Sequence, residues 1–242
     1  MRFNLLTIFP GIFESFFREG IIRRSLEKKK IEVVFTDIRD FAVDRQAMTD
    51  DRPYGGGEGM VMKPRPLAEA IRSAKSRHQE SRVILLTPQG QTYNQEIAAR
   101  LSREKGLILI CGRYEGVDER IREFFVEEEI SIGDYILTGG EPGAMVIVDS
   151  VTRLLPGVLG SKDSALMDTF SRGGLKYPQY TRPRSFEGKD VPNVLLTGDH
   201  ARIEEWRFIK SVQMTRERRP DLFAGMEFSQ EEKKVLKRYG EL

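Results

Sequence analysis

Three short segments combine glycine with polar residues, and each of them stands at the end of an expected β-strand. Their sequences are LLTPQG at residues 85–90, CGRYEG at residues 111–116 and IGDYILTGGE at residues 132–141. Open α/β sheets bind ligands beyond the carboxyl ends of their strands, and a pocket of such loops suits a purine with a small polar chain. The alternative is three tight turns that need glycine only for their geometry. Three such segments in register favour a ligand site.

The densest glycine cluster is YGGGEGM at residues 54–60. Its spacing is not G-x-G-x-x-G, because Met60 stands at the last position, and no Gly-Lys-Ser/Thr follows it, so neither a dinucleotide fold nor a phosphate loop is indicated. Glycines let a backbone approach a ligand closely. The spacing alone nevertheless favours a mobile surface loop over a binding site.

Asp168 and Arg153 are ionisable residues whose positions have ordinary structural explanations. Asp168 lies in a polar segment, where an Asp usually forms a turn or caps a helix. Arg153 comes late in an apolar helix, where a cation complements the helix dipole or pairs with Asp149 four residues earlier. The residues by themselves give neither side chain a catalytic role.

The expected helix over residues 201–218 carries a basic stripe of Arg207, Lys210 and Arg218 beside an apolar side that includes Trp206. Residues 161–242 hold 16 Lys and Arg against 13 Asp and Glu, a modest basic bias within a chain of net charge +2. The stripe is compatible with contacts to an RNA backbone and equally with a solvated helix face.

Several other classes of site have little support. His78 and His200 are too far apart to form a helical metal pair, and the single Cys111 allows neither an internal disulfide nor a thiolate metal cluster. No Ser-His-Asp ordering stands out. No apolar run approaches the ~20 residues of a membrane span, and the N-terminus lacks the features of a signal peptide. A protein of the reducing cytosol is expected.

Alternating strands and helices over the first two-thirds of the chain predict a mostly parallel sheet covered on both faces. The expected strands are residues 2–9, 31–38, 82–87, 107–111 and 130–137, and the expected helices are residues 12–29, 66–77, 94–105, 116–125 and 144–155, with a glycine-rich loop over 39–60. A polar linker and a proline-punctuated stretch then precede two helices, at residues 201–218 and 229–239.

The motifs resemble one family along the whole chain, the bacterial tRNA (guanine-N1)-methyltransferases of the SPOUT class, usually called TrmD. The matching runs are TIFP at 7–10, PYGGG at 53–57, GRYEGVDER at 112–120, SIGDYILTGGE at 131–141, RLLPGVLG at 153–160, DTF at 168–170, YTRP at 180–183 and EWR at 205–207. So many motifs in one order are a specific signal. Gln179 and Asp199 stand where some members have His, and Pro142-Gly143 departs from a Leu-Pro. None of these is a catalytic position of the family pattern.

The resemblance implies a fold that periodicity does not suggest. It is an α/β fold: a SPOUT methyltransferase domain with a deep trefoil knot over residues 1–160, a linker over 161–170 and a small C-terminal helical tRNA-binding domain over 171–242. It also implies a homodimer whose active sites are shared between subunits. The expected enzyme is cytoplasmic, with tRNA as partner and with no membrane or DNA partner.

The resemblance further implies that the knot binds S-adenosylmethionine. The cofactor-binding residues assigned in this way are Leu86, Thr87, Pro88, Gly112, Tyr114, Glu115, Ile132, Gly133, Asp134, Tyr135, Ile136, Leu137, Gly139 and Gly140. The RNA-binding residues are Arg182, Arg207, Lys210 and Arg218. No metal-ligand set is visible, and a dependence on Mg²⁺ is not readable from the sequence.

The implied reaction is methylation of N1 of the guanosine directly 3′ of the anticodon, position 37, with a guanosine preferred before it. Because guanine N1 carries a proton at neutral pH, Asp168 is expected to act as general base, and Arg153 to stabilise charge on O6. One alternative is a SPOUT methyltransferase acting on another RNA, against which the helical domain and its YTRP motif argue. The other is a non-catalytic RNA-binding protein, which would not need both Arg153 and Asp168.

Overall fold

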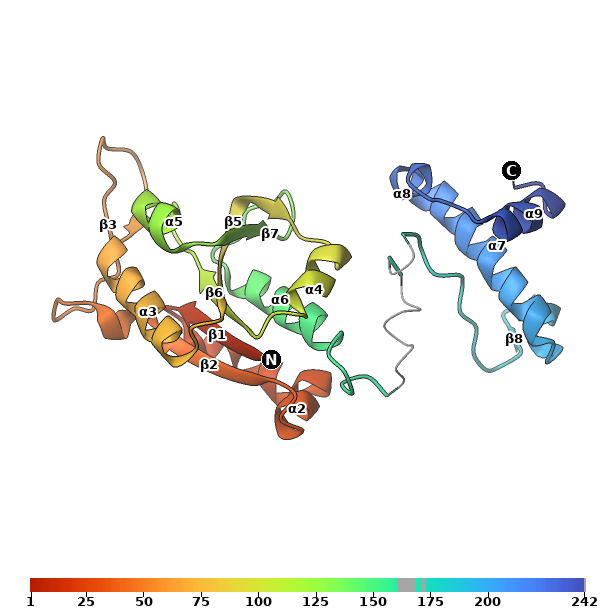
Figure 1. Cartoon of the computed structure of the whole chain (residues 1–242), viewed down its shortest axis with the longest axis horizontal. Coiled ribbons are helices and arrows are strands. Elements are labelled where there is room, and N and C mark those ends of the chain that lie inside the picture. The colour runs from red at the N-terminus through yellow and green to blue at the C-terminus, as the bar shows by residue number, and fades with distance from the viewer. Residues whose placement is uncertain (161–168, 171–172, 242) are drawn as a thin grey trace. The chain divides into compact units, whose positions relative to one another are not determined.

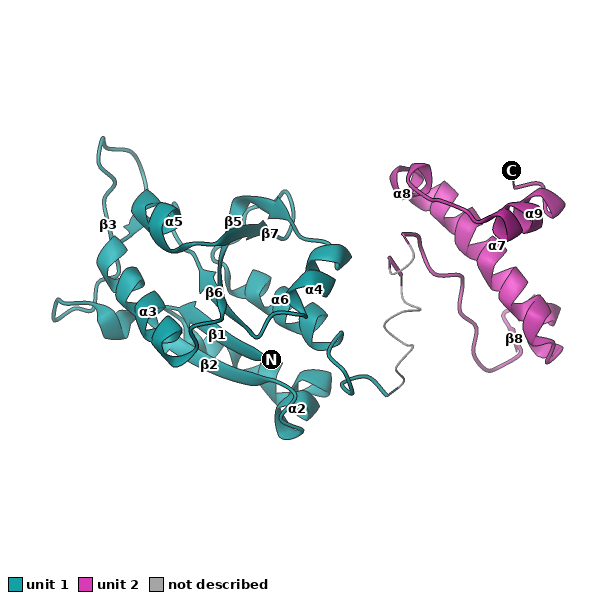
Figure 2. Cartoon of the chain, viewed as in Figure 1, with its two compact units in different colours: residues 1–161 teal, residues 162–242 magenta. Residues whose placement is uncertain are grey.

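The computed structural model of the chain describes residues 1–160, 169–170 and 173–241. The chain divides into two compact units, Met1–Ser161 and Lys162–Leu242, which Figure 2 colours separately. Asp168 and the other residues of the expected linker up to residue 168 lie outside the described residues.

The first unit is built on a five-stranded sheet in the order β2-β1-β6-β5-β7, and every neighbouring pair is parallel (Figure 1). The strands are β1 (Arg2–Thr7), β2 (Glu32–Asp37), β5 (Arg82–Thr92), β6 (Gly106–Cys111) and β7 (Glu128–Ser131). Since all five strands run in one direction, their carboxyl ends lie at one edge of the sheet. The prediction of a mostly parallel sheet is confirmed.

Helices cover both faces of this sheet, as expected, because successive side chains of a strand point to opposite faces. One face, where Phe3 and Leu5 are buried, packs against α1 (Glu14–Arg18), α2 (Gly20–Glu27), α4 (Gln95–Leu101) and α6 (Glu141–Thr152). The other face, where Leu6 is buried, packs against α3 (Pro64–Arg77) and α5 (Glu119–Phe125). The buried strands therefore carry apolar residues on both sides.

The single helix expected over residues 12–29 is wrong. The structure has a 3-10 turn, η1 (Pro10–Phe13), followed by α1 and α2, which are separated at Glu19. Glu19 is extended and Gly20 has φ +61°, a left-handed conformation that glycine adopts without steric cost. The apolar spacing continues across the break because Phe17 and Ile22 enter the same core.

Two strands end where they were not expected to end, and both differences shape the carboxyl edge of the sheet. β5 continues to Thr92, but its pairing with β7 shifts between Leu86 and Gln91, so residues 87–90 bulge out of the ladder. β7 ends at Ser131, although extended chain was expected to residue 137. The chain between Ser131 and α6 is thereby free to wrap over the edge.

The loop expected over residues 39–60 contains short regular elements. They are the 3-10 turn η2 (Ile38–Phe41) and β3 (Asp50–Asp51), which pairs with β4 (Val61–Met62). The backbone of β4 also meets the chain that follows β6, through a bridge between Met62 and Val117. The glycine cluster between β3 and β4 is therefore anchored at both of its ends.

The second unit contains α7 (His200–Arg218), α8 (Pro220–Ala224) and α9 (Gln230–Arg238), preceded by the hairpin of β8 (Ser185–Phe186) and β9 (Lys189–Asp190) and the 3-10 turn η3 (Asn193–Leu196). Its small core joins Ile209 and Val212 of α7 to Leu236 of α9. The two expected helices are confirmed, and α8 is too short to give a periodic signal. None of the helices in the described parts of the chain is long and apolar enough to cross a membrane.

Candidate active site

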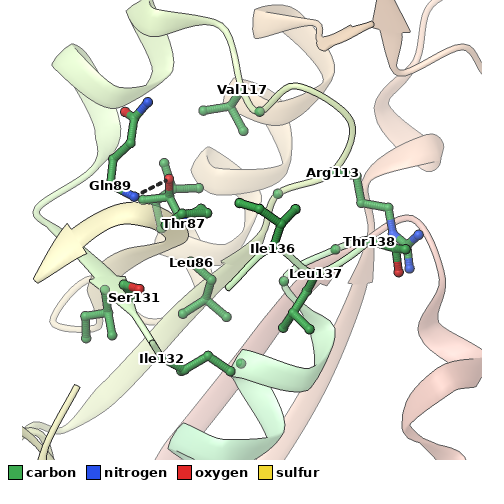
Figure 3. Close-up of a pocket in the computed structure, with 18 of the residues that line it drawn as sticks. Leu86, Thr87, Gln89, Arg113, Val117, Ser131, Ile132, Ile136, Leu137 and Thr138 are labelled. Atoms are coloured by element: carbon green, nitrogen blue, oxygen red, sulfur yellow. Dashed lines mark hydrogen bonds between the residues drawn. The ribbon is translucent and has the colours of Figure 1, made fainter. Parts of the chain in front are cut away.

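A pocket of about 410 Å³ opens at the carboxyl edge of the sheet, at the bulge of β5 and where the chain leaves β6 and β7. Its walls are three segments, residues 85–89, 112–117 and 130–140 without Asp134, which overlap the three glycine-bearing segments of the sequence. Figure 3 shows the side chains of Leu86, Ile136 and Leu137 together near the centre of the pocket, with Thr87 and Gln89 on the bulge of β5. A pocket of this volume is large enough for a nucleoside-sized ligand.

Most of the residues assigned to cofactor binding line this pocket. They are Leu86, Thr87, Pro88, Gly112, Tyr114, Glu115, Ile132, Gly133, Tyr135, Ile136, Leu137, Gly139 and Gly140. Asp134 does not line the pocket and is exposed. The structure therefore brings together three segments of chain that are far apart in sequence, because their strands are adjacent in the order β6-β5-β7.

Several residues that line the pocket were not among those assigned to cofactor binding, although some of them lie in the glycine-bearing segments. Two of them are Arg122 of α5 and Gln89, which are hydrogen-bonded to each other: Arg122 donates to the Oε1 atom of Gln89. Arg122 also donates two hydrogen bonds to the Glu129 carboxylate. The others are Leu85, Arg113, Gly116, Val117, Ile130, Ser131, Thr138 and Gly143. No local signal identifies Arg122, because its partner Gln89 is 33 residues away.

Two of the walls are bonded to each other through their backbones. The Gly140 N–H donates to the Gly112 carbonyl at 2.9 Å, and Arg113 and Gly139 form an isolated antiparallel bridge. A Cβ atom at Gly140 would lie 2.8 Å from the Cα atom of Cys111. Only glycine allows this close approach of backbones, and the contact fixes the start of α6 against the end of β6.

A buried ion pair lies behind these two walls. Glu141 is completely buried, and its carboxylate accepts hydrogen bonds from Arg113, at 3.3 and 3.2 Å, and from the Thr7 hydroxyl at 2.7 Å. The Arg113 guanidinium also stacks on the Phe9 ring, 4.4 Å from its centroid. Burial, and then the nearby Glu141 carboxylate, raise the pKa of the Cys111 thiol well above its usual value, so this cysteine is not a reactive nucleophile.

The glycine cluster of residues 54–60 lies beside the pocket. The Glu115 N–H donates to the Met60 carbonyl and the Met62 N–H to the Gly116 carbonyl, both at 2.9 Å. Tyr114 has φ +59°, and its pKa is raised by burial and by the nearby Asp50 carboxylate. The sequence reading of this segment as a surface loop describes the exposed Gly55 to Gly57, but it missed the attachment to a wall of the pocket.

The two residues to which the family resemblance gives catalytic roles are not seen together. Arg153 is the C-cap residue of α6, where its N–H donates to the Asp149 carbonyl at 3.1 Å and its side chain is half-buried. Asp168 lies outside the described residues. Arg153 is not among the residues that line the pocket.

The residues expected to bind RNA differ in how exposed their charges are. Arg182 and Arg218 are exposed. Arg207 is half-buried, pairs with Glu204 at 2.5 Å and stacks on Tyr177, and Lys210 donates to Gln213 at 2.7 Å. The stripe on α7 is therefore partly neutralised within its own unit.

The two histidines are also accounted for. His78 follows α3 and accepts a hydrogen bond from Arg2 at 2.6 Å, and His200 begins α7 at the surface. Among the described residues there is no group of three or more His, Cys, Asp or Glu side chains that could hold a metal ion.

Comparison with known proteins gives one consistent family. Residues 1–225 match the family described as tRNA (Guanine-1)-methyltransferase TrmD. The tRNA (guanine-N(1)-)-methyltransferase of Citrifermentans bemidjiense is 53% identical over 236 residues, which cover 98% of this chain and 95% of that protein. Proteins of the same name from Geotalea uraniireducens and Geobacillus kaustophilus are 54% and 50% identical, and the matches cover 98% and 99% of this chain and 96% and 98% of those proteins.

Proposed function

Because the chain belongs to the tRNA (guanine-1)-methyltransferase family, we propose that it methylates N1 of the guanosine directly 3′ of the anticodon, position 37, with S-adenosylmethionine as methyl donor. The observation that carries the proposal is an identity of 50% or more, over nearly the whole chain, with curated relatives named for this activity. A tRNA-modifying enzyme of this kind works in the cytoplasm.

The pocket fits the proposed donor in size and in lining. Leu86, Ile132 and Leu137 supply apolar surface for a purine ring, while the glycine-rich walls offer backbone donors and acceptors to the sugar and the amino acid part. S-adenosylmethionine, when bound, supplies a methyl group activated by a positively charged sulfur. The backbone at Gly112, Gly139 and Gly140 would hold S-adenosylmethionine and orient its methyl group toward the target base.

In the proposed reaction, side chains of this protein have two tasks: one removes a proton and the other stabilises a negative charge. The Asp168 carboxylate removes the proton from guanine N1 as general base, since the protonated N1 is a poor nucleophile. Negative charge then develops on O6, and the Arg153 guanidinium stabilises it. These roles rest on the family motifs RLLPGVLG and DTF in this sequence.

The proposal includes a trefoil knot and a homodimer. The knot rests on the resemblance of the segments that line the pocket to the family motifs GRYEGVDER and SIGDYILTGGE. The homodimer is supported by apolar side chains without cover in the first unit, among which Ile136 is 82% exposed and Leu137 and Val146 are more than 40% exposed. Exposed apolar surface beside a pocket is typical of a protein–protein interface.

The test of the function is methyl transfer to unmodified tRNA transcripts that differ at two positions. A transcript with guanosine at positions 36 and 37 should be methylated, with N1-methylguanosine as the product in nucleoside mass spectrometry. Adenosine at position 37 should abolish transfer, and loss of the guanosine at position 36 should reduce it. Methylation of ribosomal RNA alone would favour a different RNA substrate, and tRNA binding without transfer would favour a non-catalytic protein.

The basic stripe of α7 is expected to contribute tRNA affinity rather than chemistry. Replacing Lys210 and Arg218 together with Ala should weaken tRNA binding and lower the slope of log K against log salt by about 1–2, because each cation that neutralises a phosphate releases counterions. Filter binding at several salt concentrations measures the slope, and single-turnover rates at saturating tRNA should stay near wild type.

A matched control removes two cations from the first unit. Arg18 and Arg23 are exposed on α1 and α2, with 74% and 54% of their side-chain surface accessible, and their double Ala variant should keep the wild-type salt slope. If the Lys210 and Arg218 variant also keeps that slope, the stripe is an ordinary solvated face.

A further inference from the structure

We propose that Glu141 is a positioning residue for the methyl donor, holding two walls of the pocket in the conformation that binds it, through a buried network with Arg113 and Thr7. The inference rests on the proposed function for the identity of the ligand. Glu141 itself does not line the pocket. It acts through residues that do line it, Arg113, Gly139 and Gly140.

The network joins three parts of the first unit that are distant in sequence. Glu141 lies in the first turn of α6, Thr7 ends β1, and Arg113 follows β6. The Thr7 hydroxyl donates to the Oε1 atom of Glu141 at 2.7 Å and accepts from the Phe9 N–H at 2.9 Å. Arg113 donates from Nε and Nη2 to the two carboxylate oxygens, so the pair is bidentate.

Gly139 places this ion pair directly against the pocket wall. A Cβ atom at Gly139 would lie 2.4 Å from the Oε2 atom of Glu141 and 2.6 Å from the Nε atom of Arg113. The guanidinium–carboxylate pair therefore occupies the space behind the Cα atom of a residue that lines the pocket. Because the bridge between Arg113 and Gly139 ties the two walls together, any shift of the pair moves both walls.

The negative charge of the Glu141 carboxylate is balanced by protein groups and not by water. Its carboxylate is 0% exposed and the Arg113 side chain is 16% exposed, and the partial positive charge at the start of the twelve-residue helix α6 adds to the attraction. A glutamine at this position would keep one acceptor oxygen but could not accept from Arg113 on both sides. The half-buried guanidinium would then lose one of its two carboxylate bonds, and such groups move or rehydrate when left without a partner.

The alternative is that the network only stabilises the fold. A comparable, mostly buried carboxylate elsewhere in the same unit serves as a control that separates the positioning role from a purely stabilising one. Glu128 of β7 has a 12% exposed side chain and pairs with Arg82 and Arg100, but it does not line the pocket. Glu128→Gln removes a comparable carboxylate from two arginines and should lower the melting temperature without affecting the pocket.

The experiment measures the dissociation constant of S-adenosylmethionine by titration calorimetry on the full-length protein, together with melting temperature and methyl transfer to tRNA. Glu141→Gln should raise the dissociation constant by about 10- to 100-fold, the range that corresponds to losing a hydrogen bond between charged groups. At saturating donor the rate should stay within about threefold of wild type. Glu128→Gln should leave the dissociation constant within about threefold.

A second pair of variants keeps the proposal testable if Glu141→Gln does not fold. Thr7→Val removes the hydroxyl at almost constant shape and should weaken donor binding several-fold, whereas Thr7→Ser keeps the hydrogen bond and should restore it. Unchanged donor affinity in Thr7→Val and Glu141→Gln, with a lowered melting temperature as in Glu128→Gln, would overturn the positioning role.

The same measurements separate this inference from the proposed function. If the wild-type protein binds the donor but does not methylate position 37, the proposed substrate is wrong, and the affinities of the variants still decide the role of Glu141. If the wild-type protein does not bind the donor, both proposals are wrong.

Discussion

Replacing Asp168 with Asn is expected to lower the single-turnover rate of methyl transfer by about 10²–10⁴-fold, the contribution of one general base. Asn keeps the size and the hydrogen-bonding capacity of the side chain but cannot take the proton from guanine N1. The affinities for tRNA and for the methyl donor should stay within a few-fold of wild type, so the loss should appear in the rate at saturation.

The pH dependence of the same variant identifies the group that carries the proton. The wild-type rate should rise with pH as the Asp168 carboxylate ionises and then level off. In Asp168→Asn the rise should disappear or move to the higher pH at which guanine N1 loses its own proton. Asp168→Glu should recover part of the rate if the longer side chain reaches the base.

Two outcomes would remove the catalytic assignment of Asp168. Asn is as good a helix cap as Asp, so an unchanged rate in Asp168→Asn would mean that Asp168 has only a capping role. Asp163→Asn, five residues earlier in the expected linker, is the matched control. If it lowers the rate as strongly as Asp168→Asn, the effect comes from the segment and not from one carboxylate.

A mixture of two inactive proteins is expected to regain activity, because the proposed active site takes the pocket from one subunit and Asp168 from the other. Asp168→Ala removes the base. In Gly140→Trp even the Cβ atom would lie 2.8 Å from the Cα atom of Cys111, so this substitution should break the contact between two walls of the pocket. Under random exchange of subunits the mixture should reach about a quarter of wild-type activity, since half of the dimers are mixed and each holds one intact site.

The control for this experiment is a substitution that spares the pocket. Gly225→Ala lies at the end of α8, where a Cβ atom makes only an ordinary contact of 3.6 Å, and this protein should be active alone. Mixed dimers that form, as native mass spectrometry shows, but that stay inactive would contradict a shared site. Full activity in an isolated monomer would contradict the homodimer itself.

Much of the first unit could be predicted from the sequence because its signals are local. Buried parallel strands need apolar side chains on both faces. The run LILIC in β6 therefore predicts a central strand from its own residues alone. The start of α4 was also predicted closely, and there the Asn94 side chain caps the helix by accepting from the Ile97 N–H. The starts expected at residues 116 and 144 differ by three residues from those of α5 and α6. The three glycine-bearing segments were found because parallel strands place all their carboxyl ends at one edge.

Other features were missed because the local pattern permits two structures. The spacing of apolar residues in 12–29 is the same for one helix and for the two helices that the structure shows, and only the extended Glu19 before Gly20 distinguishes them. The end of β7 at Ser131 was missed because the apolar residues Ile136 and Leu137 continue the pattern of a strand, although they belong to the pocket wall.

Local patterns of the sequence predict the main strands and most helices, the three segments that form the pocket walls and, through the motifs, the family. The side chains that support those walls become visible only when the chain is folded. Glu141 in the first turn of a helix needs no explanation beyond the helix dipole, and nothing local connects it with Thr7, 134 residues earlier. The two side chains meet because β1 pairs with β6 and the start of α6 is bonded to the chain after β6 through Gly140 and Gly112. Such pairing between distant segments depends on the packing of the whole sheet and not on neighbouring residues.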